Sequence, residues 1–187
     1  PHYYRKFPLK TIEANVDGLK NILNFFKNKN INLLYFSSSE IYGDPPKNKI
    51  PTSEDFNGNV SCIGPRSCYD ESKRFCETLC YYYSKIYKIN IKIVRPFNNY
   101  GPGLDTNDKR LPADLANSIL KNQNIIIHSN GKPTRSYCYI SDAVTAYFAA
   151  LVYPSFEIFN VGNDKEEISV RKLALKFKNI AKKNLNY

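Results

Sequence analysis

Residues 31–40 read Ile-Asn-Leu-Leu-Tyr-Phe-Ser-Ser-Ser-Glu, an apolar run followed directly by a serine-rich segment. A short apolar run between polar residues is typical of a strand buried in a parallel sheet. The spacing of apolar residues predicts helices over 8–29 and 67–88, and a second short strand over 91–95. Helices and strands that alternate at these lengths predict an α/β fold with a parallel sheet.

Polar clusters follow both of these strands. Ser37-Ser-Ser-Glu40 comes directly after the first, and Arg95-Pro-Phe-Asn-Asn-Tyr-Gly-Pro102 begins where the second ends. Ligands of open α/β sheets bind at the carboxyl ends of the strands. Both clusters are therefore expected to face a ligand crevice.

The second half of the chain has a less regular pattern. Helices are predicted over 111–121, from Ser141 to about Leu151, and from Ser169 onward. Ser141 is expected to cap the second of these helices, with Asp142 in its first turn. Strands are predicted over 125–128, 135–140 and 157–161. The segment between residues 37 and 66 is predicted to be a long loop, because glycine and proline recur along it.

Tyr69 and Lys73 are four residues apart within the predicted helix 67–88, so both side chains lie on one helix face. An ammonium beside a phenol favours the phenolate and is expected to lower the tyrosine pKa. With a hydroxyl from the serine segment, such a pair can remove a proton from an alcohol. The alternative is a surface pair, because the chain has 15 tyrosines.

Two further charged residues have open alternatives. Glu40 in a crevice can act as a general acid or base or orient a substrate, or it is a surface carboxylate. The guanidinium of Arg135 suits phosphate or carboxylate recognition, or it forms a structural salt bridge, with Asp142 as a candidate partner.

Composition limits the class of protein. The net charge is +10, but the lysines are scattered and no nucleic-acid-binding motif occurs. The basic residues near the carboxyl end are predicted to be the solvated face of an amphipathic helix: Arg171, Lys172, Lys176, Lys178, Lys182 and Lys183. With no signal-peptide pattern and no run long enough to cross a bilayer, a soluble, cytoplasmic protein is expected.

Cysteine and histidine usage argues against a metal site. The five cysteines include no C-x-x-C pair, and the chain has only two histidines, His2 and His128. Cys76 and Cys80 share a helix face, with no histidine near them in the sequence. We expect reduced core thiols and no bound metal.

Four ordered motifs carry a resemblance to a known family. They are Ser37-Ser-Ser-Glu-Ile-Tyr-Gly-Asp44, Gly64-Pro-Arg-Ser-Cys-Tyr-Asp-Glu-Ser-Lys-Arg74, Arg95-Pro-Phe-Asn-Asn-Tyr-Gly-Pro102 and Thr134-Arg-Ser-Tyr-Cys-Tyr-Ile-Ser-Asp142. Over essentially its whole length the chain resembles the extended short-chain dehydrogenases/reductases, the NAD-dependent nucleotide-sugar epimerases and dehydratases. Within that family, residues 63–74 most resemble the branch that decarboxylates UDP-glucuronate.

The resemblance implies roles for individual residues. Tyr69 would be the catalytic base, with Lys73 as its partner and Ser38 as the catalytic hydroxyl, and Glu40 would take part in proton transfer. The residues implied to contact NAD are Asn15, Ser37, Tyr69, Lys73, Pro96 and Phe97. Those implied to contact the sugar nucleotide are Ser39, Glu40, Asn98, Arg110 and Arg135. A serine at position 39 departs from the dehydratases, which have aspartate there, and matches the decarboxylases.

The resemblance also implies a partial Rossmann-like sheet. The Gly-rich turn that cradles the dinucleotide pyrophosphate does not occur in the sequence, so the chain is expected to be an N-terminally truncated fragment with an incomplete cofactor site. Residues 1–100 would be the later part of the NAD-binding domain. Residues 101–187 would form a small α/β substrate-binding part, interleaved with Rossmann elements.

The implied activity is NAD-dependent modification of a UDP-sugar. Decarboxylation of UDP-glucuronate is the first hypothesis, and 4-epimerisation and 4,6-dehydration are the alternatives within the family. A non-catalytic binding protein that retains the fold is the alternative from another class. A homodimer through helices 8–29 and 67–88 is expected, with no nucleic-acid or membrane partner.

Overall fold

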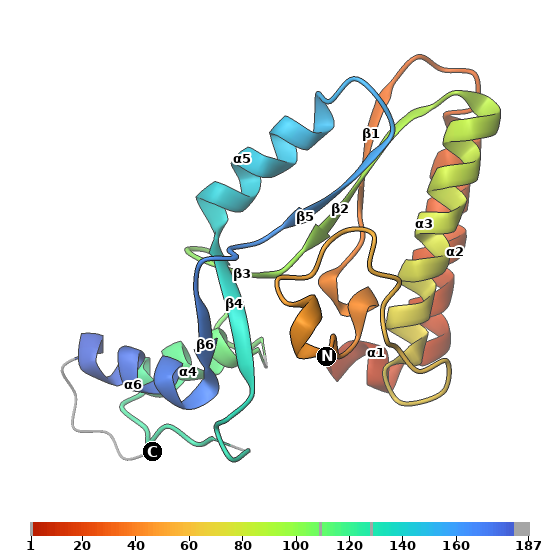
Figure 1. Ribbon diagram of the computed structural model, residues 1–187. Coiled ribbons are helices and arrows are strands. Elements are labelled where there is room, and N and C mark those ends of the chain that lie inside the picture. Colours follow the sequence, from red (N-terminus) through yellow and green to blue (C-terminus); the bar gives the residue numbers. More distant parts are fainter. Residues whose placement is uncertain (1, 109, 128, 182–187) are drawn as a thin grey trace. The chain divides into compact units, whose positions relative to one another are not determined.

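The computed structural model of the chain describes residues 2–108, 110–127 and 129–181 (Figure 1). These residues form two compact units. The first unit comprises residues 2–97 and 141–161, and the second comprises residues 98–140 and those from 162 onward. The division at residue 100 expected from the sequence remains a prediction.

A three-stranded parallel sheet organises the first unit, in the order β1 (Asn32–Phe36), β2 (Asn90–Pro96), β5 (Glu157–Val161). In the register of this sheet, Phe36 lies beside Val94 and Pro96 lies beside Val161. The carboxyl ends of the strands therefore meet at one edge, as the sequence predicted. The α/β fold with a parallel sheet is confirmed.

Two long helices, α2 (Pro8–Phe25) and α3 (Ser67–Tyr87), lie side by side against this sheet (Figure 1). Pro8 begins α2, where a proline is tolerated because the first helical N–H needs no partner. The helix ends at Phe25 rather than at residue 29, and Asn28 has a left-handed φ of 60°. Asparagine tolerates this conformation, which interrupts a helix. A short helix not expected from the sequence, α1 (His2–Lys6), precedes α2.

The core of the first unit fills the space between these two helices and the sheet. It contains Leu19 and Leu23 from α2, Cys76 and Cys80 from α3, Tyr35 from β1, and Ile89, Ile91 and Ile93 at and within β2. The last two isoleucines are fully buried, and each contributes roughly 1.5–3 kcal/mol by leaving water. This packing fixes the helix that carries Tyr69 and Lys73 against the strands.

The remaining elements of the first unit are short or lie on another face of the sheet. The loop between β1 and α3 contains two 3₁₀ turns, η1 (Ser39–Tyr42) and η2 (Lys47–Lys49). Helix α5 (Ile140–Leu151) lies on the side of the sheet away from α2 and α3 (Figure 1). Its Tyr147 ring packs edge-on against Phe36, with centroids 4.8 Å apart.

The second unit has its own small sheet and two helices. Strand β4 (Thr134–Tyr139) pairs in parallel with β3 (Asn98–Tyr100) and antiparallel with β6 (Glu167–Ser169). Helices α4 (Leu111–Leu120) and α6 (Val170–Ala181) pack through a core that contains Leu115, Ile125 and Ala174. Neither β3 nor β6 was expected, because three residues are too few to produce a pattern.

Three sequence predictions in the later part of the chain were wrong. Residues 125–127 are not a strand: Ile125 is buried in the core, but the backbone has no strand partner among the described residues. Ser141 does not cap α5, because the helix already begins at Ile140, although Asp142 is in its first turn. Ser169 ends β6 instead of beginning α6, and its hydroxyl accepts from the Lys172 N–H.

The cysteines and the basic residues singled out in the sequence have different environments. Cys76, Cys80 and Cys138 are buried, as core thiols should be, but Cys62 is exposed in the loop before α3. His128, Lys182 and Lys183 lie outside the described residues, and the side chain of His2 is not described either. Among the described helices, none combines the length and apolar character needed to cross a membrane.

Candidate functional site

The first part of the candidate site is the turn that follows β1. Ser37 and Ser38 are buried at the end of the strand, and the extended backbone of Ser38 leads into η1. The Ser38 hydroxyl caps this turn by accepting from the Glu40 N–H at 3.2 Å. The turn closes at Gly43, with φ +64°, where a Cβ would collide with the Asn59 carbonyl. The backbone that presents Ser38 and Glu40 is therefore tightly defined.

Tyr69 and Lys73 come to this turn from the first two turns of α3. The Lys73 ammonium donates to the Phe36 carbonyl at 2.8 Å and lies 5.9 Å from the centroid of the Tyr69 ring. The Ser38 hydroxyl lies within reach of the Tyr69 phenol and lowers its pKa. The structure therefore brings Ser38, Tyr69 and Lys73 together at the carboxyl end of β1.

The electrostatics of Tyr69 differ from the expectation. The pKa of Tyr69 is raised, first because burial disfavours the phenolate, while the hydrogen bond from Ser38 acts in the opposite direction. Lys73 was expected to lower the pKa of this phenol, but burial outweighs any such effect, and the ammonium is bound to a backbone carbonyl. Burial also lowers the pKa of Lys73.

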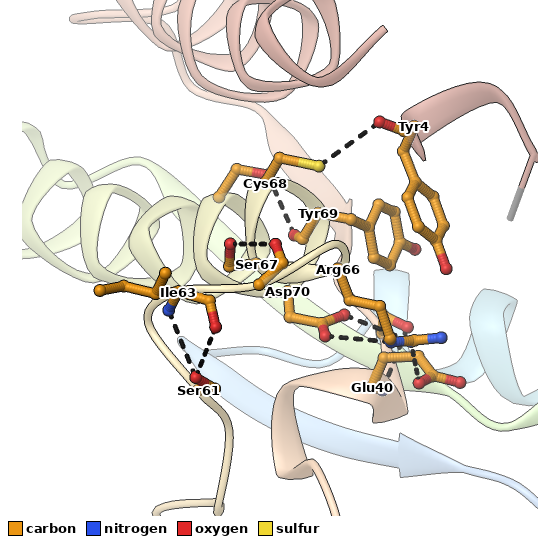
Figure 2. Close-up of polar contacts among 12 residues, drawn as sticks. Tyr4, Glu40, Ser61, Ile63, Arg66, Ser67, Cys68, Tyr69 and Asp70 are labelled. Carbon is orange, nitrogen blue, oxygen red and sulfur yellow. Dashed lines mark hydrogen bonds and ion pairs between the residues drawn. The ribbon is translucent and has the colours of Figure 1, made fainter. Parts of the chain in front are cut away.

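Glu40 belongs to an ion-pair network that sequence reasoning missed. The Arg66 guanidinium contacts the Glu40 carboxylate, and its Nε is 3.3 Å from Oδ2 of Asp70 (Figure 2). Arg66 lies within the motif Gly-Pro-Arg-Ser-Cys-Tyr, three residues before Tyr69. Its place in this motif, so near Tyr69, could have identified Arg66 as a site residue. A sequence motif does not show, however, which carboxylate an arginine pairs with.

Tyr4 on α1 is the second residue that the sequence did not identify. Its ring stacks on the Tyr69 ring with centroids 5.3 Å apart, and its carbonyl accepts from the Cys68 thiol (Figure 2). The Tyr4 hydroxyl is buried and has no hydrogen-bond partner among the described residues. The short helix α1 thus covers one face of the tyrosine.

Asn15 supports α3 from the neighbouring helix. Its amide donates to the Ser72 hydroxyl at 2.8 Å, and Ser72 in turn donates to the Tyr69 carbonyl at 3.0 Å. The Asn15 carbonyl also accepts from the Cys76 thiol. These bonds connect α2 to the turn of α3 that carries Tyr69.

The other residues implied by the resemblance are divided between the two units. Pro96 and Phe97 lie at the end of β2, where the Phe97 N–H donates to the Val161 carbonyl at 2.8 Å. Ser39 is in η1, beside Glu40. Asn98, Arg110 and Arg135 belong to the second unit.

The three residues of the second unit have local partners. The Asn98 amide donates to the Ser136 carbonyl at 3.1 Å, and Arg135 on β4 donates to the Thr134 carbonyl at 2.7 Å. Arg110 precedes α4 and is bound to Asp108, with Nε 2.6 Å from Oδ2. Arg110 therefore already neutralises a carboxylate, whereas Arg135 has a backbone carbonyl as its partner.

Part of the site fits a nicotinamide dinucleotide. The Ser37 hydroxyl is buried and has no partner among the described residues, and Lys73 holds its ammonium at the same strand end. A hydroxyl and an ammonium at the carboxyl end of a parallel strand suit the hydroxyl groups of a ribose. The Gly-rich turn that would hold the pyrophosphate is not in the sequence.

A comparison with protein families identifies the chain. The profile of the NAD dependent epimerase/dehydratase family matches residues 1–162. The chain belongs to the NAD-dependent epimerase/dehydratase family. The description of this family names NAD as the cofactor.

Curated members of the family show what the chain is similar to. It is 36% identical over 171 residues to UDP-glucuronic acid decarboxylase 1 of Xenopus tropicalis, covering 91% of this chain and 40% of that protein. It is 39% identical over 166 residues to UDP-glucuronic acid decarboxylase 6 of Arabidopsis thaliana, covering 89% and 48%. The chain thus spans less than half the length of these two relatives.

Solved structures of the family have the same fold. The UDP-glucose 4-epimerase of Thermotoga maritima superposes with a TM-score of 0.88 at 23% identity, over 100% of this chain and 60% of that one. A UDP-glucuronic acid 4-epimerase from Bacillus cereus, in complex with UDP-glucuronic acid and NAD, has a TM-score of 0.81 at 26% identity, over 94% and 54%. The partial Rossmann-like fold expected from the motifs is confirmed.

Proposed function

We propose that this chain carries the proton-transfer part of a UDP-glucuronate decarboxylase. The observation that supports the proposal most strongly is the convergence of Ser38, Tyr69 and Lys73 at the end of β1. The identity to curated decarboxylases supports the choice of substrate. Ser39 agrees with this choice, since it occupies the position where the resemblance gives dehydratases an aspartate.

The first chemical step is oxidation of the sugar at carbon C4. Tyr69 removes the proton of the C4 hydroxyl, and Ser38 donates a hydrogen bond to the same oxygen while its charge develops. Lys73 supports the phenolate electrostatically from the next turn of α3. When bound, NAD supplies the hydride acceptor for C4 and the hydride donor for the last step.

The second step follows from the chemistry of the product. A 4-keto glucuronate is a β-keto acid, so the bond between C5 and the carboxylate breaks, carbon dioxide leaves, and the electron pair moves onto the C4 oxygen as an enolate. We assign Ser39, Glu40, Asn98 and Arg135 to holding the sugar nucleotide, with Arg110 in a lesser role, and Glu40 to delivering the proton that C5 receives. Asn15, Pro96 and Phe97 border the cofactor in this proposal.

A direct assay of products tests the decarboxylase assignment. The full-length gene product that contains this chain is incubated with NAD and UDP-glucuronate, and the products are analysed by mass spectrometry. We expect UDP-pentose and carbon dioxide in equal amounts, and neither from the Tyr69→Phe variant. UDP-galacturonate without carbon dioxide would instead establish an epimerase, the alternative that the similarity to the Bacillus cereus enzyme favours.

The cofactor site of this chain by itself is a separate proposal. Because the Gly-rich turn is not in these 187 residues, we expect only weak NAD binding by the isolated chain. Isothermal titration calorimetry measures this directly. Tight binding would show that the site does not need the turn, and binding that is lost in Lys73→Met would assign the remaining affinity to the strand end.

A further inference from the structure

Arg66 is connected to both segments that form the candidate site. Its backbone carbonyl accepts from the N–H groups of Tyr69 and Asp70, at 2.9 and 3.1 Å, so it is part of the first turn of α3. Its guanidinium reaches out of that turn to the Glu40 carboxylate on η1 (Figure 2). One side chain therefore bridges the helix that carries the tyrosine and the turn that carries the serine hydroxyl.

The second partner of the guanidinium holds it in place. Nε and Nη2 of Arg66 lie 3.3 and 3.4 Å from the two oxygens of Asp70, whose side chain is only 10% exposed. Cζ of Arg66 is 5.8 Å from the centre of the Tyr4 ring, which itself stacks on the Tyr69 ring. A lysine cannot make this set of contacts, because it lacks the planar fork.

We propose that Arg66 is a positioning residue for the proton transfer at Tyr69. By holding Glu40 and Asp70 in one ion-paired network, it sets the geometry between the η1 turn and α3. It also supplies the positive charge that balances the carboxylates of Glu40 and Asp70. This proposal rests on the proposed function of Tyr69 as the base, but not on which sugar is the substrate.

The charges around Tyr69 support this role. After burial, the groups that raise the pKa of Tyr69 are the carboxylates of Glu40 and Asp70 and the Tyr4 phenol on α1. Ser38, from the turn after β1, lowers the pKa through its hydrogen bond. Both carboxylates thus oppose formation of the phenolate that the reaction needs.

Two cations are available to compensate these carboxylates. Lys73 lies near the Tyr69 ring, but its ammonium is bonded to the Phe36 carbonyl. Arg66 is paired directly with both carboxylates. Loss of Arg66 would leave the negative charge of Glu40 and Asp70 unbalanced beside the phenol.

The test measures how the rate of UDP-glucuronate conversion by the full-length gene product with NAD depends on pH, with the products followed by mass spectrometry. Arg66→Met is expected to lower kcat roughly 10- to 100-fold, because the turn and the helix lose the ion-paired link that lies beside Tyr69. The midpoint of the acid limb is expected to move to higher pH, since the phenolate becomes harder to form. Arg66→Lys keeps the charge, so the midpoint should return to the wild-type pH while kcat stays below wild type.

Asp70→Asn provides a test of opposite sign. It removes a negative charge near the phenol, so the midpoint should move to lower pH, a change that a purely structural role would not produce. Arg74→Lys is the matched control on the same helix. Arg74 donates to the Ile41 and Asn57 carbonyls, so its variant should lose stability but keep the wild-type midpoint.

The outcomes separate this proposal from the proposed function. A folded Arg66→Met enzyme whose kcat and acid-limb midpoint equal those of the wild type overturns the role of Arg66. If Arg66→Met does not fold, a wild-type kcat in Arg66→Lys overturns it instead. A shift of Asp70→Asn to higher pH overturns the electrostatic part. Conversion of UDP-glucuronate to UDP-galacturonate without carbon dioxide release in the wild type refutes the decarboxylase assignment and leaves the role of Arg66 intact.

Discussion

The Lys73 ammonium donates a hydrogen bond to the Phe36 carbonyl, with 2.8 Å between the two atoms. This bond joins the second turn of α3 to the last residue of β1, directly before Ser37 and Ser38. A backbone carbonyl is a fixed partner, so it holds the ammonium at one place beside the strand end. Lys73 is therefore anchored by the sheet and not by the phenol of Tyr69.

Removal of this ammonium should impair the reaction more than the fold. We expect Lys73→Met to lower kcat on the order of 100-fold, because the positive charge beside the base is lost. The measurement is the rate of UDP-pentose formation by the full-length gene product with NAD and saturating UDP-glucuronate. Lys85→Met is the control: this lysine is exposed on the same helix, and its loss should leave kcat unchanged. Wild-type kcat in Lys73→Met would refute the assigned role.

The raised pKa of Tyr69 predicts the direction of the pH dependence. Burial makes the phenolate harder to form, so the active form of the base is lost as pH falls through the Tyr69 pKa. We expect kcat/KM to rise with pH along an acid limb. Tyr69→Phe should lower kcat roughly 100- to 10,000-fold and remove this limb from the residual activity. A profile that rises as pH falls would contradict Tyr69 as the base.

The sequence predicts the sheet better than it predicts the site network. The strands β1, β2 and β5 are recognisable because each contains a short apolar run between polar residues. Tyr69 and Lys73 follow from helical spacing. The contact between Arg66 and Glu40 joins residues 26 positions apart through a loop without periodicity. Its ends are brought together only by tertiary packing, which no local pattern specifies.

The wrongly predicted strand at residues 125–128 also reflects tertiary packing. Ile125 and Ile127 alternate with an exposed Ile126, which is a strand pattern, but a strand also needs a partner for its backbone. Here the buried isoleucine packs with helices instead. Likewise Ser37 and Tyr4 have buried hydroxyls without partners among the described residues, a property that only the folded arrangement reveals.

A buried ion pair stabilises the same region of the sheet. The Arg95 guanidinium contacts the Glu77 carboxylate at 2.7 Å, with the two side chains 8% and 11% exposed, and it also donates to the Tyr42 hydroxyl. Glu77→Ala leaves the guanidinium charged and unpaired, so the free energy of unfolding should fall by about 3–5 kcal/mol. Urea denaturation followed by circular dichroism measures this change.

The control for this prediction is another carboxylate on α3. Glu71 lies 3.7 Å from Arg74, and both side chains are about one-third exposed, at 36% and 34%. Water screens this pair, so Glu71→Ala should cost less than about 1 kcal/mol. Equal losses of unfolding free energy in Glu77→Ala and Glu71→Ala would show that burial does not determine how much the Arg95–Glu77 pair contributes to stability.

The paired helices α2 and α3 leave apolar side chains on their outer surface. Phe25 is 65% exposed, Tyr82 is 56% exposed and Tyr81 is 44% exposed. Large exposed apolar side chains on paired helices are typical of an interface. We expect the chain to form a homodimer through α2 and α3, in which these side chains are covered by the second copy.

A charge on this surface should dissociate the dimer. Phe25→Asp would place a carboxylate among apolar side chains, where it cannot be solvated, so we expect a monomer in analytical ultracentrifugation. Phe148→Asp on α5 is the matched control, because this phenylalanine is also 65% exposed but lies on the other side of the sheet (Figure 1). It should leave the dimer intact. A Phe25→Asp variant that remains dimeric, or a Phe148→Asp variant that dissociates, would assign the interface to a different surface.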